Sequence, residues 1–390
     1  MLALITTPFS AAPFSIAAAT KCRKVLVKCF KGSSSSEEDV GFPAFLPKEV
    51  ENIKDPCARN LAKRIQRLPV QTSFSDGSIM SSCVKPLMQN DTAPVVLLHG
   101  FDSSCLEWRY TYPLLEQAGL EAWAVDILGW GFSDLEKTPS CSVASKREHL
   151  YQLWKTYIKK PMVLVGPSLG AAVSIDFAIN HPEAVEKLVL VDASVYTEGT
   201  ESLSTLPRPV AYAGVSLLKS IPLRLYANFL AFNSVSLDTS FDWVKVGRLH
   251  CLLPWWEDAT VDFMISGGYN VSAQIGQTEQ ETLIIWGEDD QIISNKFAAR
   301  LQHEMQNAVV HQIPDCGHIP HVEKPDSVAK CIVDFIQGMF QYTATLHKNV
   351  FFHDIGSYTH KDVSLDELST VLLPQDFEIG IFIDIIAFGL

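Results

Sequence analysis

The stretch Val163-Leu-Val-Gly-Pro-Ser-Leu-Gly-Ala-Ala172 decides the fold of this chain of 390 residues. An apolar run over residues 162–165 predicts a buried strand, and the Ala-rich residues 171–180 have helical spacing. Between them, the pattern Gly-x-Ser-x-Gly centred on Ser168 predicts a tight turn, in which the two glycines let the neighbouring backbone come close. Such a turn, a nucleophile elbow, exposes the serine hydroxyl at a helix N-terminus, where free N–H groups can hold a developing oxyanion.

The pattern around Ser168 is short enough to arise by chance, so its meaning depends on the rest of the chain. The alternative is a Gly-Ser turn that only connects a strand to a helix. A catalytic serine needs a base and an orienting acid from other strands of the same sheet.

Strands and helices alternate before and after this turn. The apolar residues 93–101 predict a strand buried on both faces, hence central and parallel. Further segments continue the alternation: a helix at 106–117, a strand at 121–125, a helix at 143–159 and a strand at 184–191. The sequence therefore predicts an α/β fold, with a mostly parallel central sheet, helices on both faces and ligands at the carboxyl ends of the strands.

Residues 198–278 interrupt the alternation with several prolines, many aromatic residues and mostly helical patterns. The alternation then returns with a strand at 282–286, a helix at 294–304, a strand at 308–313 and a helix at 326–339. We therefore expect a core in two parts, 93–197 and 279–341, separated by a helical lid at 198–278. A second independent domain is the alternative.

The two ends of the chain differ from this core. Residues 1–36 contain no Asp or Glu, are rich in Ala, Ser and Thr, and carry their basic residues late, which is typical of a transit peptide. The scarcity of early arginine favours the plastid stroma (chloroplast) over the mitochondrion. Residues 37–92 form an N-terminal extension, with a helix-like segment at 47–67 interrupted at Pro56 and a hairpin around Asp76-Gly77. We assign no function to the tail, residues 342–390.

Composition excludes several other classes of protein. A net charge of −13 without a basic patch disfavours nucleic acid as a partner, and no apolar run is long enough to span a bilayer. Nine cysteines without a Cys-x-x-Cys pair resemble neither a disulfide framework nor a zinc site, so a reducing compartment is expected. Nothing calls for a metal or an organic cofactor, and a small molecule is the expected partner.

Candidates for the base and the acid follow the last two strands. His318 lies after the final strand, preceded by Gly317, which frees the loop to turn the imidazole inward, and His321 is its competitor. For the acid, a turn after the strand at 282–286 offers Asp290 first and Asp289 next. Asp192, at the end of another strand, is a third candidate.

An oxyanion hole needs two N–H groups. Leu169, directly after the serine, supplies one, and Phe101, after the first central strand, is placed to supply the second. Residues 103–105 are expected to line or shape that loop. His99 is expected to be structural.

Five motifs in this order resemble the α/β-hydrolase superfamily over about residues 93–341. They are His99-Gly-Phe, Asp126 with Gly129-Trp-Gly-Phe-Ser-Asp134, Gly166-Pro-Ser-Leu-Gly170, Gly287-Glu-Asp-Asp290 and Gly317-His-Ile-Pro-His-Val-Glu-Lys-Pro325. The position of the lid resembles the branch that holds epoxide hydrolases, haloalkane dehalogenases, C–C bond hydrolases and plastid hydrolases such as pheophytinase. Together with the N-terminal segment, the chain is most similar to plant plastid hydrolases.

The resemblance supports Asp290 as the acid and His318 as the base, and a serine at the nucleophile position speaks against the first two classes. Pro167 departs from the family, in which many members carry His, Asn or Gln there. The expected activity is cleavage of an ester or thioester of a small, apolar substrate through a Ser168–His318–Asp290 triad and an acyl-enzyme. A C–C bond hydrolase remains open, as does a non-catalytic or single-turnover ligand receptor similar to the strigolactone and karrikin receptors.

Overall fold

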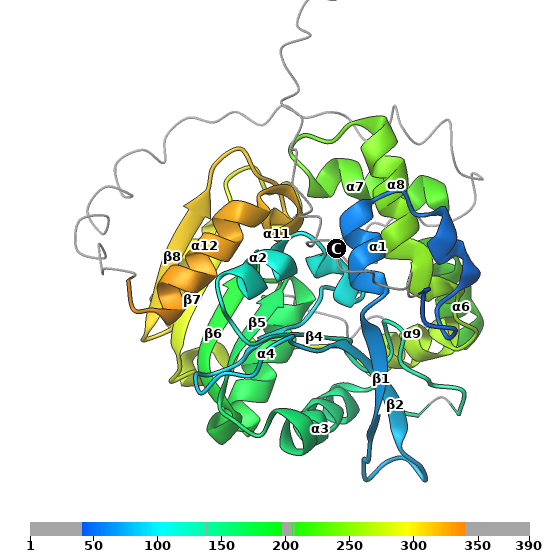
Figure 1. The fold of residues 1–390 in the computed structure, drawn as a ribbon, viewed down its shortest axis with the longest axis horizontal. Helices are drawn as coiled ribbons and strands as arrows, with labels where there is room; N and C mark the ends of the chain where they lie inside the picture. The colour runs from blue at the N-terminus through cyan, green and yellow to red at the C-terminus, as the bar shows by residue number, and fades with distance from the viewer. Residues whose placement is uncertain (1–40, 138, 197–204, 206, 340–390) are drawn as a thin grey trace, which may run out of the picture. The chain divides into compact units, whose positions relative to one another are not determined.

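The computed structural model describes residues 41–137, 139–196, 205 and 207–339, so the predicted transit peptide and the tail lie outside the described residues. One sheet of eight strands organises them, in the order β1-β2-β4-β3-β5-β6-β7-β8 (Figure 1). The strands are β1 (Ile65–Val70), β2 (Ile79–Val84), β3 (Val95–Leu97), β4 (Ala122–Val125), β5 (Met162–Pro167), β6 (Val185–Val191), β7 (Glu281–Gly287) and β8 (Ala308–Ile313). Strands β3 to β8 pair in parallel, and the β1–β2 hairpin joins β4 antiparallel.

This arrangement confirms the predicted α/β fold with a mostly parallel sheet. Strands β3 and β5, next to each other at its centre, are fully buried, as their apolar sequences require. Because all the parallel strands point the same way, the loops after β3, β5, β6, β7 and β8 meet at one edge of the sheet.

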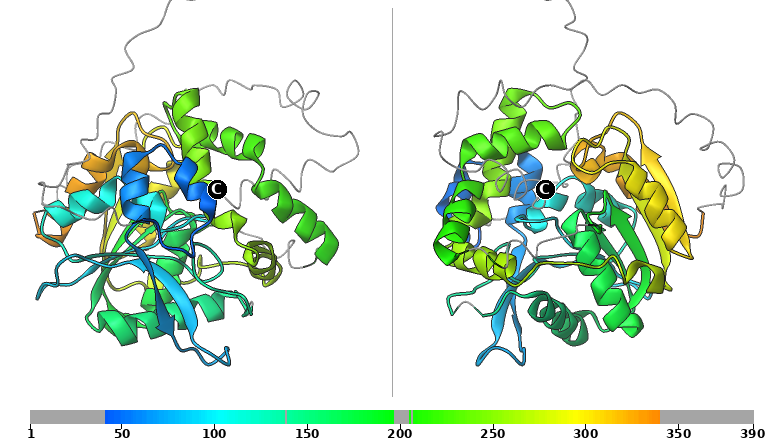
Figure 2. Two further views of the ribbon diagram at one scale, coloured as in Figure 1. Left: turned by 45° about the vertical axis from the view of Figure 1, so that its right-hand side comes forward. Right: turned by 180° about the vertical axis from the view of Figure 1, so that it is seen from behind.

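Alternate residues of each central strand face opposite layers of helices. Val95 and Leu97 of β3 pack in the layer that holds α2 (Thr111–Gln117) and α12 (Pro325–Ile336), two helices in contact with each other. Val96 of the same strand packs in the other layer. That layer holds α3 (Val143–Leu153), α4 (Leu169–Asn180) and α10 (Lys296–Glu304). The views in Figure 2 show the sheet between the two layers.

The N-terminal region differs from the expectation in two places. Pro56 does not interrupt a helix but begins α1 (Pro56–Ala62), because proline fits the first helical position and Asp55 accepts the N–H groups of Cys57 and Ala58. The preceding segment is a short 3-10 helix, η1 (Lys48–Asn52). The predicted helical character of residues 65–67 was wrong, since β1 already begins at Ile65 and continues into the predicted hairpin with β2.

Between β6 and β7 lies the predicted helical insertion, which the structure describes at 205 and 207–278. Its helices are α6 (Arg208–Leu218), α7 (Ile221–Ala231), α8 (Leu237–Arg248) and α9 (Trp256–Ile265), with short 3-10 turns η5 (Leu249–Leu252) and η6 (Ile275–Gln277). Helix α6 contacts α9, and α7 contacts α8 (Figure 1). Among the described helices, none combines the length and hydrophobicity needed to cross a bilayer.

Shorter elements complete the described chain. They are η2 (Cys105–Trp108), a π-helical turn η3 (Trp154–Ile158) that ends the predicted helix at 143–159, η4 (Pro182–Ala184) and α11 (Pro320–Glu323). The π turn ends at Lys159, whose φ of 63° is left-handed and closes the helix before β5.

Among the described residues, six cysteines are free and buried: Cys83, Cys105 and Cys141 in the first half of the chain, and Cys251, Cys316 and Cys331 in the second. Cys57 is disulfide-bonded, which departs from the expectation of reduced thiols throughout. Three of the free thiols belong to each layer of the core.

Candidate active site

Ser168 occupies the tight turn between β5 and α4 that the sequence predicts. Its φ of 48° is left-handed, a conformation that costs a non-glycine residue on the order of 1–3 kcal/mol. The flanking residues Gly166 and Gly170 make this tight turn possible, because the backbone passes too close to them to leave room for a side chain. A Cβ on Gly166 would lie 2.1 Å from the carbonyl oxygen of Gly170, and a Cβ on Gly170 would lie 2.6 Å from that of His99. The serine is therefore held in one strained position by its neighbours.

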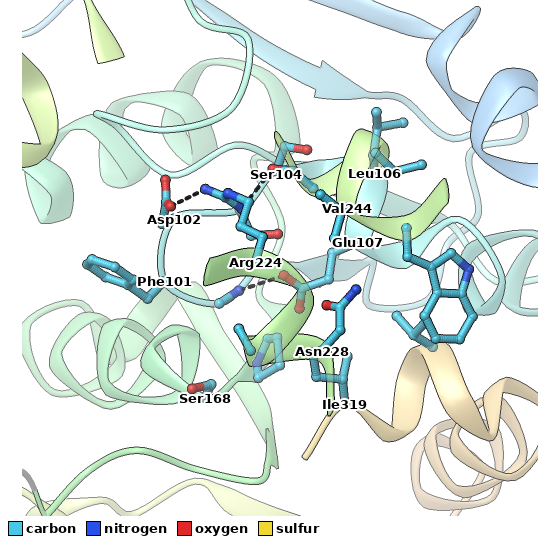
Figure 3. Close-up of a pocket in the computed structure, with 18 of the residues that line it drawn as sticks. Phe101, Asp102, Ser104, Leu106, Glu107, Ser168, Arg224, Asn228, Val244 and Ile319 are labelled. Carbon is cyan, nitrogen blue, oxygen red and sulfur yellow. Dashed lines mark hydrogen bonds and ion pairs between the residues drawn. The ribbon is translucent and has the colours of Figure 1, made fainter. Parts of the chain in front are cut away.

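The loop after β3 lies against this serine. Gly100 is so close that a Cβ built on it would be 3.7 Å from the Cβ of Ser168. Gly100, Phe101 and Ser168 line one pocket, which Figure 3 shows between the loop and the insertion helices. Leu169 begins α4, so its N–H is among the first four of that helix, which have no partner within the helix. Of the two predicted oxyanion residues, Leu169 thus follows the serine at the start of α4, and Phe101 lies on the loop after β3.

His318 and Asp290 meet at the same edge of the sheet. The Nδ1 atom of His318 lies 2.8 Å from Oδ2 of Asp290, and both side chains are almost fully buried. The other carboxylate oxygen of Asp290 accepts the N–H groups of Ile292 and Ile293 at 2.8 and 3.0 Å. Burial would raise the pKa of Asp290, but His318 and these N–H groups outweigh it and lower the pKa below its ordinary value. The carboxylate is thus ionised beside the imidazole, and His318 lines the pocket with Ser168.

The two competing acids take other places. Asp289 is exposed, and its Oδ2 accepts the side-chain amide of Asn233 at 2.7 Å. Asp192 is fully buried beside Asp290, and its Oδ1 accepts the N–H of Gly287 at 2.9 Å. Burial is the main cause that raises the pKa of Asp192 well above its ordinary value, and the negative charge of Asp290 raises it further. The raised pKa favours the uncharged form of Asp192, whose hydrogen bond to Gly287 supports the turn that carries Asp290.

His321, the competing base, belongs to a second imidazole–carboxylate pair in the same pocket. Its Nε2 lies 2.6 Å from Oε1 of Glu107, and its ring packs on Trp108 at 4.4 Å between centroids. Burial would raise the pKa of Glu107, but its hydrogen bond to His321 and the charge of that ring outweigh it and lower the pKa to about 2. Sequence reasoning missed Glu107, because only the fold brings it to a histidine 214 residues away.

The remaining motif residues shape the loops. His99 uses both ring nitrogens on the backbone, Nδ1 with the carbonyl of Gly100 at 2.7 Å and Nε2 with the N–H of Ile127 at 3.0 Å. Asp126 accepts the N–H groups of Cys105 and Phe132 at 2.6 and 2.9 Å. These contacts fix the loop after β3 to the loop after β4, so that Phe101 stands beside the pocket. Ser103 and Ser104 of that loop line the pocket, whereas Cys105 begins η2 and is buried.

A buried polar cluster joins the same loop to the insertion. Asp102, next to Phe101, forms an ion pair with Arg224 of α7 and accepts hydrogen bonds from His250 at 3.0 Å and from Trp256 at 2.7 Å. The guanidinium also contacts the Sγ atom of Cys251 at 2.9 Å. Asp102, His250 and Cys251 have the donor atoms of a metal site, but Arg224 already supplies the positive charge among them. Sequence reasoning missed this cluster, since Arg224 stands in no recognisable motif.

Comparison with known proteins places this geometry in a family. Residues 95–330, more than half of the chain, match the family model described as "Alpha/beta hydrolase family". The chain is 62% identical over 301 residues to the alpha/beta hydrolase domain-containing protein VTE7 of Arabidopsis thaliana, a match covering 76% of this chain and 91% of that protein. It is 27% identical over 259 residues to a 2-hydroxy-6-oxononadienedioate/2-hydroxy-6-oxononatrienedioate hydrolase of Paraburkholderia xenovorans, covering 62% and 86%.

Solved structures share the fold at lower identity. A meta-cleavage product hydrolase of Pseudomonas fluorescens matches with a TM-score of 0.56 and 20% identity, over 70% of this chain and 98% of that one. An esterase of Thermogutta terrifontis matches with a TM-score of 0.58 and 18% identity, over 70% and 98%. The sheet order, the strained serine turn and these matches agree, and the chain belongs to the α/β-hydrolase family.

Proposed function

We propose that this α/β hydrolase is a serine hydrolase that cleaves an ester or thioester bond of a small, apolar substrate. The observation that carries the proposal is the buried pair of His318 and Asp290, 2.8 Å apart, in the pocket that Ser168 also lines. A neutral imidazole oriented by an ionised carboxylate is the base that an otherwise weak serine nucleophile requires.

In this mechanism the hydroxyl of Ser168 attacks the carbonyl carbon of the substrate while His318 takes the hydroxyl proton. Asp290 keeps the imidazole in the tautomer whose other nitrogen faces the serine. The N–H groups of Leu169 and Phe101 stabilise the tetrahedral oxyanion, and His318 returns the proton to the leaving alcohol or thiol. A water molecule, activated by the same histidine, then releases the acid and restores Ser168.

The walls of the pocket support an apolar substrate. The insertion contributes Leu218, Leu223, Phe232, Trp243 and Val244, whereas the loops of the core contribute most of the polar groups. Pockets of this kind bind the apolar body of a ligand along their walls and fix its reacting group with a few polar atoms. The insertion thus serves as the lid of the site, and the described residues 93–137, 139–196 and 279–339 form the catalytic core.

A second candidate, hydrolysis of a C–C bond, is favoured by the relatives named as hydrolases of 2-hydroxy-6-oxononadienedioate. The same serine, histidine and acid would serve that reaction, so kinetics must separate the two. Turnover of p-nitrophenyl esters with a kcat/KM in the ordinary enzymatic range of about 10⁴ M⁻¹s⁻¹ or more favours the esterase. Trace ester turnover, with rapid cleavage of a vinylogous 1,5-diketone, favours the C–C hydrolase.

The similarity to a plant protein also supports the expected place of action in the plastid stroma. The segment that would direct the chain there, 1–36, lies outside the described residues. Import of the radiolabelled full-length chain into isolated chloroplasts, followed by protease treatment, tests this part. A protected, shortened product supports it, and a chain that stays fully digestible contradicts it.

The test of the chemistry uses a fluorophosphonate probe, which labels only an activated serine. The full-length protein should be labelled rapidly, Ser168→Ala not at all, and His318→Ala far more slowly. His311→Ala is the matched control, since His311 lies on β8 outside the pocket. Labelling that persists in Ser168→Ala would contradict the proposed nucleophile.

A further inference from the structure

The pocket beside Ser168 is lined by charged side chains as well as apolar ones. Asp102, Glu107 and Arg109 come from the loop and the short helix after β3, and Arg224 comes from α7 of the insertion. Figure 3 shows Arg224 reaching from the insertion to Asp102, above Phe101 and Ser168. Two cations and two anions thus line the pocket. Whether a charged substrate can bind there depends on whether each of these charges is already paired within the protein.

Arg224 is matched by Asp102. Its Nη2 donates to Oδ2 of Asp102, and its Nη1 donates to the carbonyl of Gly247 at 3.3 Å. The second carboxylate oxygen of Asp102 is held by His250 and Trp256. Burial would raise the pKa of Asp102, but Arg224 and His250 outweigh it and lower the pKa below its ordinary value. The carboxylate is therefore ionised and cancels the charge of the guanidinium in place.

Arg109 is matched by a carboxylate outside the pocket. Its Nε donates to Oδ2 of Asp55 at 2.9 Å, and both side chains are 5% exposed. Its guanidinium also lies over the rings of Tyr110 and Trp243, at 4.6 and 5.4 Å from their centroids. The charge of Arg109 is therefore already matched by Asp55.

The remaining groups follow the same pattern. Glu107 is paired with His321 at 2.6 Å, and His318 is paired with Asp290 at 2.8 Å. Within the described part of the chain, each arginine on the pocket wall therefore has a carboxylate as its counter-ion, and Glu107 and His318 each have a hydrogen-bonded partner.

We infer that the pocket selects substrates that carry no charge near the scissile bond, and that Asp102 sets this selectivity by neutralising Arg224. A carboxylate entering the pocket would lose its hydration without meeting an unmatched cation, which is unfavourable. One donor, Nε of Arg224, has no partner among the described residues. A neutral carbonyl or hydroxyl oxygen suits it, because the charge behind it is already cancelled. The inference rests on the proposed function and specifies its substrate class.

The first experiment compares matched pairs of esters on the full-length protein. One pair differs in the acyl part, p-nitrophenyl hexanoate against mono-p-nitrophenyl adipate. The other differs in the alcohol part, methyl 4-acetoxybenzoate against 4-acetoxybenzoate. Each kcat/KM is divided by the rate of alkaline hydrolysis of the same ester, which removes differences in intrinsic reactivity.

The neutral ester should be preferred by about 100-fold or more in at least one pair, which corresponds to about 2.7 kcal/mol. A preference below about 3-fold in both pairs would overturn the inference. Ser168→Ala should abolish turnover of all four esters. If it does not, the proposed function fails, whatever the selectivity shows.

The second experiment tests whether Asp102 sets the preference for neutral esters. Asp102→Asn keeps an acceptor for Trp256 but leaves the charge of Arg224 unmatched, so the preference for neutral esters should fall by about 10-fold or more. Asp91→Asn is the control, since it removes the same charge from an exposed residue outside the pocket and should leave the preference unchanged. A preference in Asp102→Asn equal to that of the wild type would overturn the assigned role of Asp102.

A double variant covers the case in which Asp102→Asn does not fold. Asp102→Asn with Arg224→Gln removes both charges and leaves no unmatched ion in the interior. The preference for neutral esters should then stay within about 3-fold of the wild type. A rise of about 10-fold or more would show that Arg224 serves as a receptor for substrate carboxylates, which is the opposite of the inference.

Discussion

The backbone N–H of Gly100 donates to Oε2 of Glu107 at 3.1 Å, while Oε1 of the same carboxylate is held by His321. Gly100 directly precedes Phe101, the proposed oxyanion donor. Glu107 therefore holds the peptide that directly precedes the one carrying the N–H of Phe101, and His321 holds Glu107.

Removal of the hydrogen bond between Gly100 and Glu107 should weaken transition-state stabilisation more than substrate binding. Glu107→Ala should lower kcat on a p-nitrophenyl ester by about 10- to 100-fold with little change in KM, since a misplaced oxyanion donor costs mainly transition-state stabilisation. Glu107→Gln keeps an acceptor for Gly100 and should retain most of kcat. Equal losses in the two variants would argue that the charge, not the hydrogen bond to Gly100, matters.

The same substitution, Asp to Asn, should have a large effect on activity at Asp290 and a small one at its neighbour Asp192. Asp290→Asn removes an ionised partner of His318 and should lower kcat by about 10³-fold or more. Asp192→Asn keeps a side-chain oxygen that can accept the N–H of Gly287, and burial, by raising the pKa of Asp192, already favours its uncharged form, so activity should change by less than about 5-fold. Steady-state kinetics on one ester distinguish the two. A large loss in Asp192→Asn alone would make Asp192 the acid.

The pKa of Glu107, lowered from 4.5 to about 2, makes this residue a source of acid sensitivity. A carboxyl whose folded-state pKa is depressed stabilises the fold above its unfolded pKa, and this contribution is lost as the pH falls from about 4.5 to about 2. The contribution is on the order of 3 kcal/mol. Urea unfolding of the wild type should therefore weaken more steeply than that of Glu107→Gln over this window. Parallel curves for the two proteins would contradict the assignment.

The left-handed backbone of Ser168 predicts a difference between two inactive variants. Glycine adopts this conformation without steric cost, whereas alanine retains the strain, so Ser168→Gly should be more stable than Ser168→Ala by about 1 kcal/mol. Thermal unfolding of the two variants measures the difference. If the alanine variant is the more stable, the flexibility of unfolded glycine outweighs the strain at this turn.

Much of the fold could be predicted from the sequence because its signals are local. The apolar runs of β5 and β7 and the glycines around Ser168 each act on their own neighbourhood, and the predicted strand at 308–313 is β8 as observed. Local signals failed where two readings compete. Residues 65–67 continue the helix-like spacing of the segment before them, but β1 forms there because it pairs with β2.

The lining of the pocket was less accessible to prediction. Asp290 and His318 follow strands of one parallel sheet, so topology alone brings them to one edge. Arg224 and Asp102 are 122 residues apart, and their pairing depends on how the insertion packs over the loop after β3. Composition shows that the insertion is aromatic and helical, but it does not show which of its side chains reaches the core.

The six free thiols within the described part of the chain can serve as chemical reporters of local opening. Burial is the main cause that raises the pKa of Cys141 to about 11 and those of Cys83 and Cys331 to about 12, so in the closed fold they are neither reachable nor reactive at pH 8. Alkylation at each position therefore records how often its surroundings open. Because Cys251 sits in the insertion and Cys83 in the sheet, the ratio of their labelling rates measures whether the lid detaches without the core unfolding.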